Sequence, residues 1–311
     1  MEIVFCGTPQ FAVPSLAALV EGGEFNVRLV VCQPDRPAGR GLALTAPPVK
    51  QFALQQGIPV TQPEQIRNNR DFQAQLESIR PEAIVVVAYG RILPPWMLDL
   101  PPLGNINLHA SLLPKYRGAA PIQWAIARGE AVTGVTTMRI DTGLDTGDIL
   151  LARELPIEPE DTAETLAPRL AAFGAPVLAE TLRGLKAGAI APRPQDSNAA
   201  TLAPTLKKED GRIDFSRSAI EIWNRLRGFT PWPGAYTRFR GKTLHLWSVR
   251  PAQGCAESLA SGQLHVSGVH LYVGCGQGTA LEVFAVQMEG KKRMSARDFV
   301  NGYQPKPRDI A

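Results

Sequence analysis

Short apolar stretches alternate with amphipathic stretches over the first 130 residues of the chain. The apolar stretches predict strands at 2–7, 26–33, 58–63, 82–90 and 105–109. The stretches between them predict helices at 11–23, 49–57, 69–80 and 120–130, and residues 34–48 are expected to form a loop. Strands that alternate with helices form a mostly parallel sheet with helices on both faces. We therefore expect a Rossmann-like α/β fold, which binds its ligands beyond the carboxyl ends of the strands.

The pattern changes after residue 130. Residues 131–140 and 148–157 alternate like a pair of strands, and 160–188 predict a long helix that opens with a capping box of Asp161 and Glu164. Residues 189–206 are rich in proline and small residues and have no periodicity, so we interpret them as a linker. Residues 207–311 contain one short helix, at 219–227, and then short strands separated by glycine-rich turns. This part is expected to be a small OB-like β-barrel domain after an α/β domain at 1–188.

Composition adds limits rather than a function. Apolar residues make up 44% of the 311, charged residues 20%, and the net charge is +4, as in an ordinary two-domain globular protein. No C-x-x-C pair is present, so buried reduced thiols are favoured over a disulfide framework or a metal site for the four cysteines Cys6, Cys32, Cys255 and Cys275. The chain has no apolar run of about 18 residues and no leader-like start. We expect a cytoplasmic protein that neither enters a membrane nor holds a metal.

The chain has one histidine before residue 245, and it lies at the end of a predicted strand. Asn107 and His109 are two residues apart in the strand 105–109, so their side chains project to the same side. An amide and an imidazole that converge on one point suit an oxygen that gains negative charge. The alternative is a histidine that bonds a backbone carbonyl and an asparagine that caps a turn. The segment alone does not separate the two interpretations.

Three carboxylates crowd the loop "DTGLDTGD", at Asp141, Asp145 and Asp148. A functional loop and a turn held by Asx hydrogen bonds are both consistent with this composition. The D-T-G repeat also occurs in aspartic proteases, but those are all-β proteins with two symmetric lobes. The first strand is followed by "GTPQF" with a single glycine, which argues against a dinucleotide or ATP site.

Basic residues gather in two places. The loop 35–41, "DRPAGRG", contains Arg36 and Arg40, and residues 205–250 hold ten Lys/Arg against four Asp/Glu with aromatic residues interleaved. Small barrels with basic faces often bind nucleic acid. A solvated basic surface over an aromatic core would have the same composition.

The motifs "GTPQF", "QPDRPAGRG", "VVVAYG", "NINLHASLLPKYRGAAPIQWAI", "TGVTTMRIDTGLDTGDIL" and "FTPWPGAY" occur in an order that closely resembles the methionyl-tRNA formyltransferase family. The resemblance covers nearly the whole chain. It implies 10-formyltetrahydrofolate as the formyl donor and the catalytic set Asn107, His109 and Asp145. It also implies that Ser111, Leu112, Leu113 and Pro114 line part of the folate site.

The resemblance further implies transfer of the formyl group to the α-amino group of methionine on initiator tRNA, for translation initiation. It assigns tRNA contacts to Arg36, Arg40, Lys207 and Lys208, catalysis to the domain 1–188 and tRNA binding to the domain 207–311. We expect a monomer. Three alternatives are a formyltransferase that acts on a small amine, a non-enzymatic RNA-binding protein, and a hydrolase that releases formate from the folate.

Overall fold

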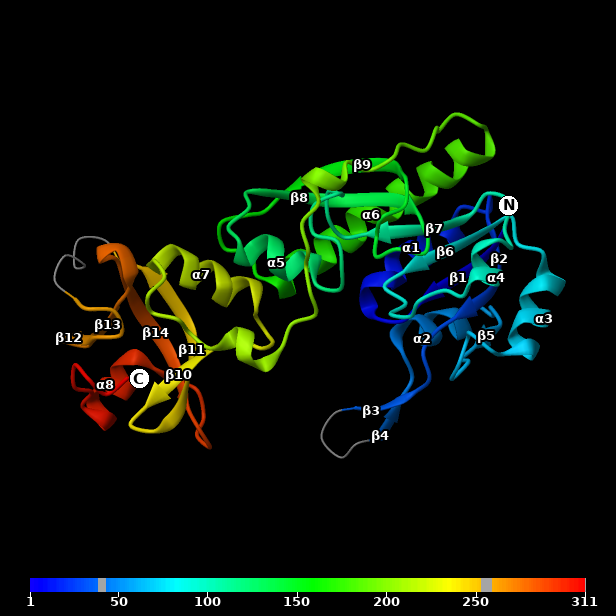
Figure 1. The fold of residues 1–311 in the computed structure, drawn as a ribbon. Helices are drawn as coiled ribbons and strands as arrows, with labels where there is room; N and C mark the ends of the chain where they lie inside the picture. Colours follow the sequence, from blue (N-terminus) through cyan, green and yellow to red (C-terminus); the bar gives the residue numbers. More distant parts are fainter. Residues whose placement is uncertain (39–42, 253–258, 311) are drawn as a thin grey trace. The chain divides into compact units, whose positions relative to one another are not determined.

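A computed structural model describes residues 1–38, 43–252 and 259–310. The chain divides into two compact units (Figure 1). Unit 1 consists of Met1–Pro121, Val132–Pro156 and Ala167–Pro204, and unit 2 of Ile122–Ala131, Ile157–Leu166 and Thr205–Ala311. The expected boundaries at 188 and 207 remain a prediction.

Unit 1 is built on a seven-stranded sheet with the order β5-β2-β1-β6-β7-β8-β9. Its strands are β1 (Glu2–Gly7), β2 (Asn26–Val31), β5 (Val60–Thr61), β6 (Ala83–Val87), β7 (Asn105–His109), β8 (Val132–Arg139) and β9 (Ile149–Pro156). The first five of these are parallel, and β8 and β9 continue the sheet in antiparallel pairing. The mostly parallel Rossmann-like sheet is therefore confirmed. β7 lies at the point where the pairing changes from parallel to antiparallel.

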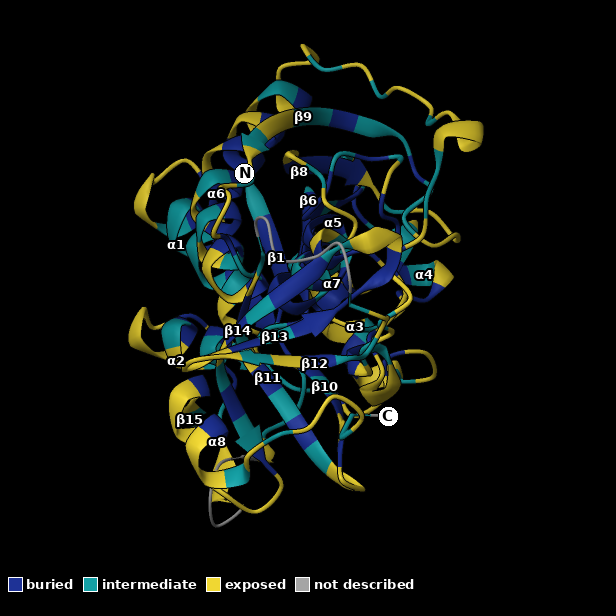
Figure 2. Ribbon diagram, turned by 90° about the vertical axis from the view of Figure 1, so that its left-hand side faces the viewer, coloured by how far each residue is buried: buried dark blue, intermediate teal, exposed yellow. Residues whose placement is uncertain are grey.

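Helices cover both faces of this sheet, as expected. They are η1 (Gln10–Ala12), α1 (Val13–Glu21), α2 (Pro48–Gln55), α3 (Arg70–Ile79), α4 (Pro95–Leu98), and α6 (Ala163–Lys186) from Ala167 onward. On one face the buried side chains of β1, β2 and β6 pack with Phe72 of α3 and Met97 of α4. On the other face Gly174 of α6 lies against Leu108 of β7. Figure 2 shows the buried residues concentrated in the strands, and β6 is buried at every position.

Two local predictions for the α/β part of the chain were wrong, and one short helix was not predicted. The expected loop 34–48 contains a hairpin of β3 (Arg36–Ala38) and β4 (Ala43–Thr45), whose strands are too short to show a period, and it also contains the first residue of α2. The four-residue helix α4 was not predicted for the same reason. The reciprocal cap of α6 is formed by Thr162 and Thr165, whose hydroxyls accept from each other's backbone N–H, rather than by Asp161 and Glu164.

Residues 189–204, the greater part of the expected linker, belong to unit 1. Their backbone forms isolated bridges, antiparallel between Arg193 and Ile149 and parallel between Leu202 and Arg117. A short 3-10 helix, η2 (Ser197–Ala199), lies between the two bridges. The segment thus runs along unit 1 with its backbone hydrogen-bonded at both ends.

Unit 2 contains an antiparallel sheet with the order β10-β11-β14-β13-β12, and β15 pairs with β14. Its strands are β10 (Ala235–Phe239), β11 (Lys242–Pro251), β12 (Leu264–Ser267), β13 (His270–Gly274), β14 (Ala280–Met288) and β15 (Met294–Ser295). The helices are α5 (Pro121–Ala127, in unit 2 from Ile122), α7 (Ala219–Gly228) and α8 (Ala296–Tyr303), with short 3-10 turns η3 (Lys208–Gly211) and η4 (Gly276–Gly278). The antiparallel C-terminal domain and the helix near 219–227 are confirmed. α8, which begins after the capping residue Ser295, was not predicted.

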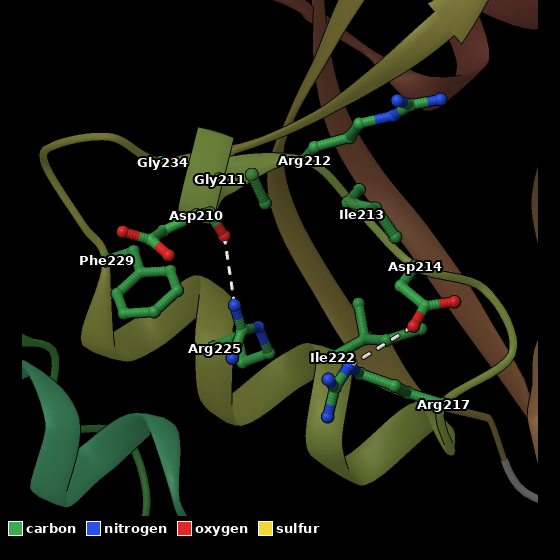
Figure 3. A pocket seen from close by; sticks show the side chains of 11 residues that line it. Asp210, Gly211, Arg212, Ile213, Asp214, Arg217, Ile222, Arg225, Phe229 and Gly234 are labelled. Carbon is green, nitrogen blue, oxygen red and sulfur yellow. Dashed lines mark hydrogen bonds and ion pairs between the residues drawn. The ribbon is translucent and has the colours of Figure 1, made fainter. Parts of the chain in front are cut away.

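A small pocket lies beside α7 (Figure 3). In it the Arg225 guanidinium donates to the Asp210 carbonyl at 3.1 Å and lies 4.9 Å from the centre of the Phe229 ring. Burial lowers the pKa of Arg225 from its usual value. None of the predicted catalytic residues lines this pocket.

The described cysteines, Cys6, Cys32 and Cys275, are buried free thiols, and Cys255 lies outside the described residues. Burial raises the pKa of Cys32 to about 11 and that of Cys275 to about 12, so both remain thiols at neutral pH. Among the described helices, none is long and apolar enough to cross a membrane.

Candidate active site

Strand β7 presents three polar side chains on the face that α4 covers in part. Asn105 donates its amide to the carbonyls of Met97 and Leu98 in α4, and the alternation of the strand places Asn107 and His109 on the same face. His109 is 6% exposed, whereas Asn107 is partly exposed. The side-chain amide of Asn107 makes no hydrogen bond with any residue that the structure describes. It is therefore available to a ligand at the carboxyl end of β7.

The two ring nitrogens of His109 face different partners. Nε2 lies 3.0 Å from the carbonyl oxygen of Tyr116, and Nδ1 lies 3.7 Å from Oδ2 of Asp145. Because a carbonyl oxygen only accepts, Nε2 carries the hydrogen in this arrangement. The histidine therefore does bond a backbone carbonyl, as the alternative interpretation proposed. Its other nitrogen nevertheless faces a carboxylate, which that interpretation did not include.

The fold distinguishes the three aspartates of the loop 141–148. Asp141 stabilises its own turn, since its carboxylate accepts from the backbone N–H of Gly143 and from the hydroxyl of Thr146. The Asp148 side chain has no hydrogen-bond partner among the described residues. Within the described chain, Asp145 is the one carboxylate in an ion-pair contact with His109. This contact supports Asp145, rather than Asp141 or Asp148, as the member of the predicted catalytic set. The spacing of the three aspartates could not make that selection.

Gly118 links the turn after β7 to Asp145. Its backbone N–H donates to Oδ2 of Asp145 at 2.8 Å. Its φ is +122°, and a Cβ on it would lie 2.7 Å from the carbonyl oxygen of Ala203. A side chain would therefore strain the backbone and collide with Ala203. The Asp145 carboxylate is therefore held by a backbone amide that only glycine presents well.

The segment predicted to line the folate site is a turn fastened to β8. The Ser111 hydroxyl donates to the carbonyl of Lys115, the Leu113 N–H donates to Oγ1 of Thr136, and the Thr136 hydroxyl donates back to the carbonyl of Ser111. Ser111 and Leu113 are buried. Only Leu112 and Pro114 of the four predicted residues keep partly exposed side chains.

The predicted tRNA-binding residues lie apart in the chain. Arg36 is exposed at the start of β3 and donates to Oε1 of Gln33, while Arg40 lies outside the described residues. Lys207 and Lys208 belong to unit 2, are exposed, and have no ion pair within the described ranges. They flank the start of η3.

Sequence reasoning missed several residues around the catalytic set. Tyr116 contacts His109 through its carbonyl, Thr136 holds the turn, and Gln195 hydrogen-bonds the Asp145 loop from the expected linker. Ile92 is 92% exposed after β6, and Leu144, directly before Asp145, is 62% exposed. Of the residues around the catalytic set, only Gly118, a glycine in the short turn after β7, had a local signal in the sequence. In the described part of the chain no group of three or more His, Cys, Asp or Glu side chains could hold a metal.

Comparison with known proteins covers both units. Residues 1–182 match the family model described as formyl transferase, and residues 205–304 match the model described as formyl transferase, C-terminal domain. A methionyl-tRNA formyltransferase of Koribacter versatilis is 64% identical over 309 residues, which are 99% of this chain and 98% of the relative. One of Acidobacterium capsulatum is 60% identical over 304 residues, 97% of this chain and 96% of the relative.

Solved structures share the fold at lower identity. The sugar 3N-formyl transferase WlaRD, crystallised with dTDP and 5-N-formyl-THF, has a TM-score of 0.65 and 18% identity over 94% of this chain and 99% of its own. An N-formyltransferase of Helicobacter canadensis, in complex with folinic acid and dTDP-3-aminofucose, has a TM-score of 0.67 and 17% identity over 92% of this chain and 98% of its own. These structures support the fold, and the high identity over full length goes further. It shows that the chain belongs to the methionyl-tRNA formyltransferase family.

Proposed function

We propose that this chain transfers the formyl group of 10-formyltetrahydrofolate to the α-amino group of methionine on initiator tRNA. The observation that carries the proposal is the contact between His109 and Asp145 beside the available amide of Asn107, in a chain 64% identical to a methionyl-tRNA formyltransferase. The solved sugar formyltransferases are less than 20% identical, so they support the fold and not a sugar acceptor.

The residues present suit a formyl donor. A formyl oxygen only accepts hydrogen bonds, and Asn107 has an amide with both N–H groups available to it. Near the same strand ends, exposed apolar side chains at Ile92 and Leu144 suit the flat ring system of a folate. Leu112 and Pro114 add apolar surface, whereas the Ser111 hydroxyl and the Leu113 amide are already used within the chain.

The reaction forms one bond from nitrogen to the formyl carbon and breaks the bond from that carbon to N10 of the folate. As the amine attacks, the formyl oxygen becomes negative, and the Asn107 amide donates to it. His109 is held on one side by the Tyr116 carbonyl and lies beside Asp145 on the other, so its ring orients that carboxylate at the site.

A proton must also move from the attacking amine to the leaving N10. Oδ2 of Asp145 accepts from Gly118, whereas Oδ1 makes no hydrogen bond within the described residues. Oδ1 can therefore take the proton, directly or through a water, and return it to N10. Binding both substrates in the correct orientation supplies much of the remaining rate increase.

The tRNA contacts are assigned to Arg36, Arg40, Lys207 and Lys208. Lys207 and Lys208 support the assignment because they are exposed cations without an acidic partner in the described ranges. Such residues position a phosphate backbone without reading bases. We assign catalysis to residues 1–188, a linker to 189–206 and tRNA binding to 207–311, and we propose that the enzyme acts as a monomer in the cytoplasm.

The test is formyl transfer from 10-formyltetrahydrofolate to methionine on initiator tRNA. Asn107→Ala, His109→Ala and Asp145→Asn are each expected to lower kcat by about 10²–10⁴-fold, the usual range for an oxyanion donor or a general base. Asp148→Asn is the matched control, since it changes a carboxylate of the same loop that has no described partner. Glycinamide ribonucleotide and uncharged tRNA serve as alternative acceptors. Transfer to glycinamide ribonucleotide instead of charged tRNA would refute the acceptor, and full activity of the three variants would refute the site.

A further inference from the structure

The side chain of Gln195 lies at the centre of a closed set of hydrogen bonds. Its Oε1 accepts from Nε of Arg117 at 3.0 Å and from Nη2 of Arg117 at 2.8 Å. Its Nε2 donates to the carbonyls of Asp145 at 2.9 Å and Gly147 at 2.7 Å. An amide has two donors and two acceptor sites, so Gln195 uses its full capacity in these four bonds.

Arg117, which donates to Gln195, lies between Tyr116 and Gly118 in the sequence. These two neighbours contact His109 and Asp145. The preceding carbonyl, of Tyr116, meets Nε2 of His109, and the following N–H, of Gly118, donates to Oδ2 of Asp145. The backbone of Arg117 itself is fixed, since its N–H donates to the Thr201 carbonyl and its carbonyl accepts from Ala203. His109, Asp145, Gln195 and Arg117 therefore form a ring of contacts that closes on itself.

The charge of Arg117 strengthens this ring. The residue is only 8% exposed, and its guanidinium forms no ion pair with any described carboxylate. A buried cation on Oε1 polarises the amide and makes its N–H groups better donors. The bonds from Gln195 to Asp145 and Gly147 are thus reinforced by a charge that no carboxylate in the described part of the chain neutralises.

The loop 141–148 has a conformation that these hydrogen bonds stabilise. Asp145 has φ +52°, in the left-handed region that is unfavourable for a residue with a side chain. Gly147 is buried, so its carbonyl would have no partner if Gln195 were lost. Without these bonds the loop can relax toward an ordinary conformation, and the Asp145 carboxylate then moves away from His109.

We propose that Gln195 and Arg117 are positioning residues for formyl transfer, which hold Asp145 against His109 without touching either substrate. The inference rests on the proposed function for its kinetic part only. It also gives the segment 189–204 a role in supporting the site, through Gln195.

The kinetic test uses Gln195→Ala in the full-length enzyme. We expect kcat to fall by about 10–100-fold, the effect of a displacement of about 1 Å. The KM values for the folate and for the charged tRNA should stay within about twofold, because no substrate contact is lost. Asp196→Ala is the matched control, since this exposed neighbour only accepts from the N–H of Asn198 at the start of η2. A loss in Asp196→Ala equal to that in Gln195→Ala would overturn the proposal.

Two further variants separate positioning from general stabilisation. The glutamate of Gln195→Glu can still pair with Arg117, so the unfolding free energy should stay close to that of the wild type. Its other carboxylate oxygen faces the carbonyls of Asp145 and Gly147 and cannot donate to them, so kcat should fall. In the Asp145→Asn background, Gln195→Ala should lower kcat little further, because it acts through the group already lost. Full additivity of the two changes, or an active Gln195→Glu enzyme, would contradict the inference.

A substrate-free measurement keeps this inference separate from the proposed function. The imidazole resonance of His109 can be assigned by its absence in His109→Ala. Gln195→Ala should shift it in the same direction as Asp145→Asn, and Asp196→Ala should leave it in place. An unshifted resonance in Gln195→Ala would refute the positioning role even if transfer to the charged tRNA is observed. A shifted resonance with no such transfer would refute the acceptor alone.

Discussion

Gly118 is the residue at which backbone conformation and catalysis meet most directly. Its positive φ, its close approach to Ala203 and its N–H bond to Asp145 all depend on the missing side chain. A side chain at this position is therefore expected to change both the unfolding free energy and the rate of formyl transfer.

We predict that Gly118→Ala lowers the unfolding free energy by about 1–3 kcal/mol, through left-handed strain and the clash with the Ala203 carbonyl. Because the N–H to Asp145 is displaced, kcat should fall as well. Urea unfolding and the formylation assay measure the two effects. The control is Gly302→Ala in α8, where a Cβ has open space and helix propensity favours alanine by about 0.5–1 kcal/mol. Equal stability changes in the two variants would show that Gly118 is not strained.

Asp35 lies at the base of the β3–β4 hairpin in a network of side chains. Both its oxygens accept from Nζ of Lys50, at 2.9 and 2.8 Å, and Oδ1 also accepts from Gln62. These bonds, first those from Lys50, hold the pKa of Asp35 below its usual value of 3.8. The network connects the hairpin that carries Arg36 to the edge of the sheet.

The lowered pKa predicts a specific pH dependence. A carboxylate with a depressed folded pKa contributes stability that is present above its unfolded pKa and is lost as the pH falls through the folded value. The difference in unfolding free energy between wild type and Asp35→Asn should thus be constant above about pH 5 and shrink below about pH 4. Urea titrations from pH 7 to pH 3 measure it. A difference that persists unchanged in acid would exclude the ionised network, and Lys50→Met should remove most of the dependence.

At the scale of elements, strand β7 depends on the helix behind it. Gly174 of α6 is buried, and a Cβ there would lie 2.9 Å from Cδ2 of Leu108 and 3.3 Å from Cγ1 of Val135. Leu108 stands between Asn107 and His109 on the opposite face of the strand. Any outward shift of Leu108 therefore moves both of the side chains that we propose as catalytic, those of Asn107 and His109.

We predict that Gly174→Val lowers the unfolding free energy by about 1–3 kcal/mol, the usual cost of overpacking, and also lowers kcat. Ala172→Val is the control, because it adds a branched side chain to an exposed position of the same helix, at a cost of about 0.5 kcal/mol in helix propensity. Thermal unfolding and single-turnover formylation would measure both. If both variants behave alike, the contact between α6 and β7 does not restrict the site.

At the scale of the whole molecule, the net charge of +4 is too small to account for RNA binding by a general field. Local cations must therefore provide the contacts with phosphate. Each such contact releases counterions, so affinity should fall steeply as salt is added.

A plot of log affinity for tRNA against log salt concentration has a negative slope. We predict that Lys207→Ala combined with Lys208→Ala makes this slope less steep by up to about 2 units. Filter binding of initiator tRNA at several salt concentrations gives the slope. Lys186→Ala is the control, since Glu82 already pairs with that lysine at 3.3 Å. An unchanged slope in the double variant would remove both lysines from the tRNA-binding surface.

The two units of the molecule do not follow the order of the chain. Unit 2 includes Ile122–Ala131 and Ile157–Leu166, which lie within the predicted catalytic domain 1–188. Their local pattern predicted secondary structure correctly for α5 and approximately for α6. It held no information on which core each helix joins, because burial of an amphipathic face is decided by partners distant in the chain.

The sequence by itself determined the α/β alternation, the second domain of short strands, the family and the candidates Asn107 and His109. These follow from periods and motifs that are local, since strand and helix patterns repeat within a few residues. Only the tertiary structure separated Asp145 from Asp141 and Asp148, and only it joined Gln195 to the site. The bond from Gly118 to Asp145 spans 27 residues and that from Gln195 to Asp145 spans 50. Hydrogen bonds at such separations depend on where the folded backbone brings each donor and acceptor, which no local pattern encodes.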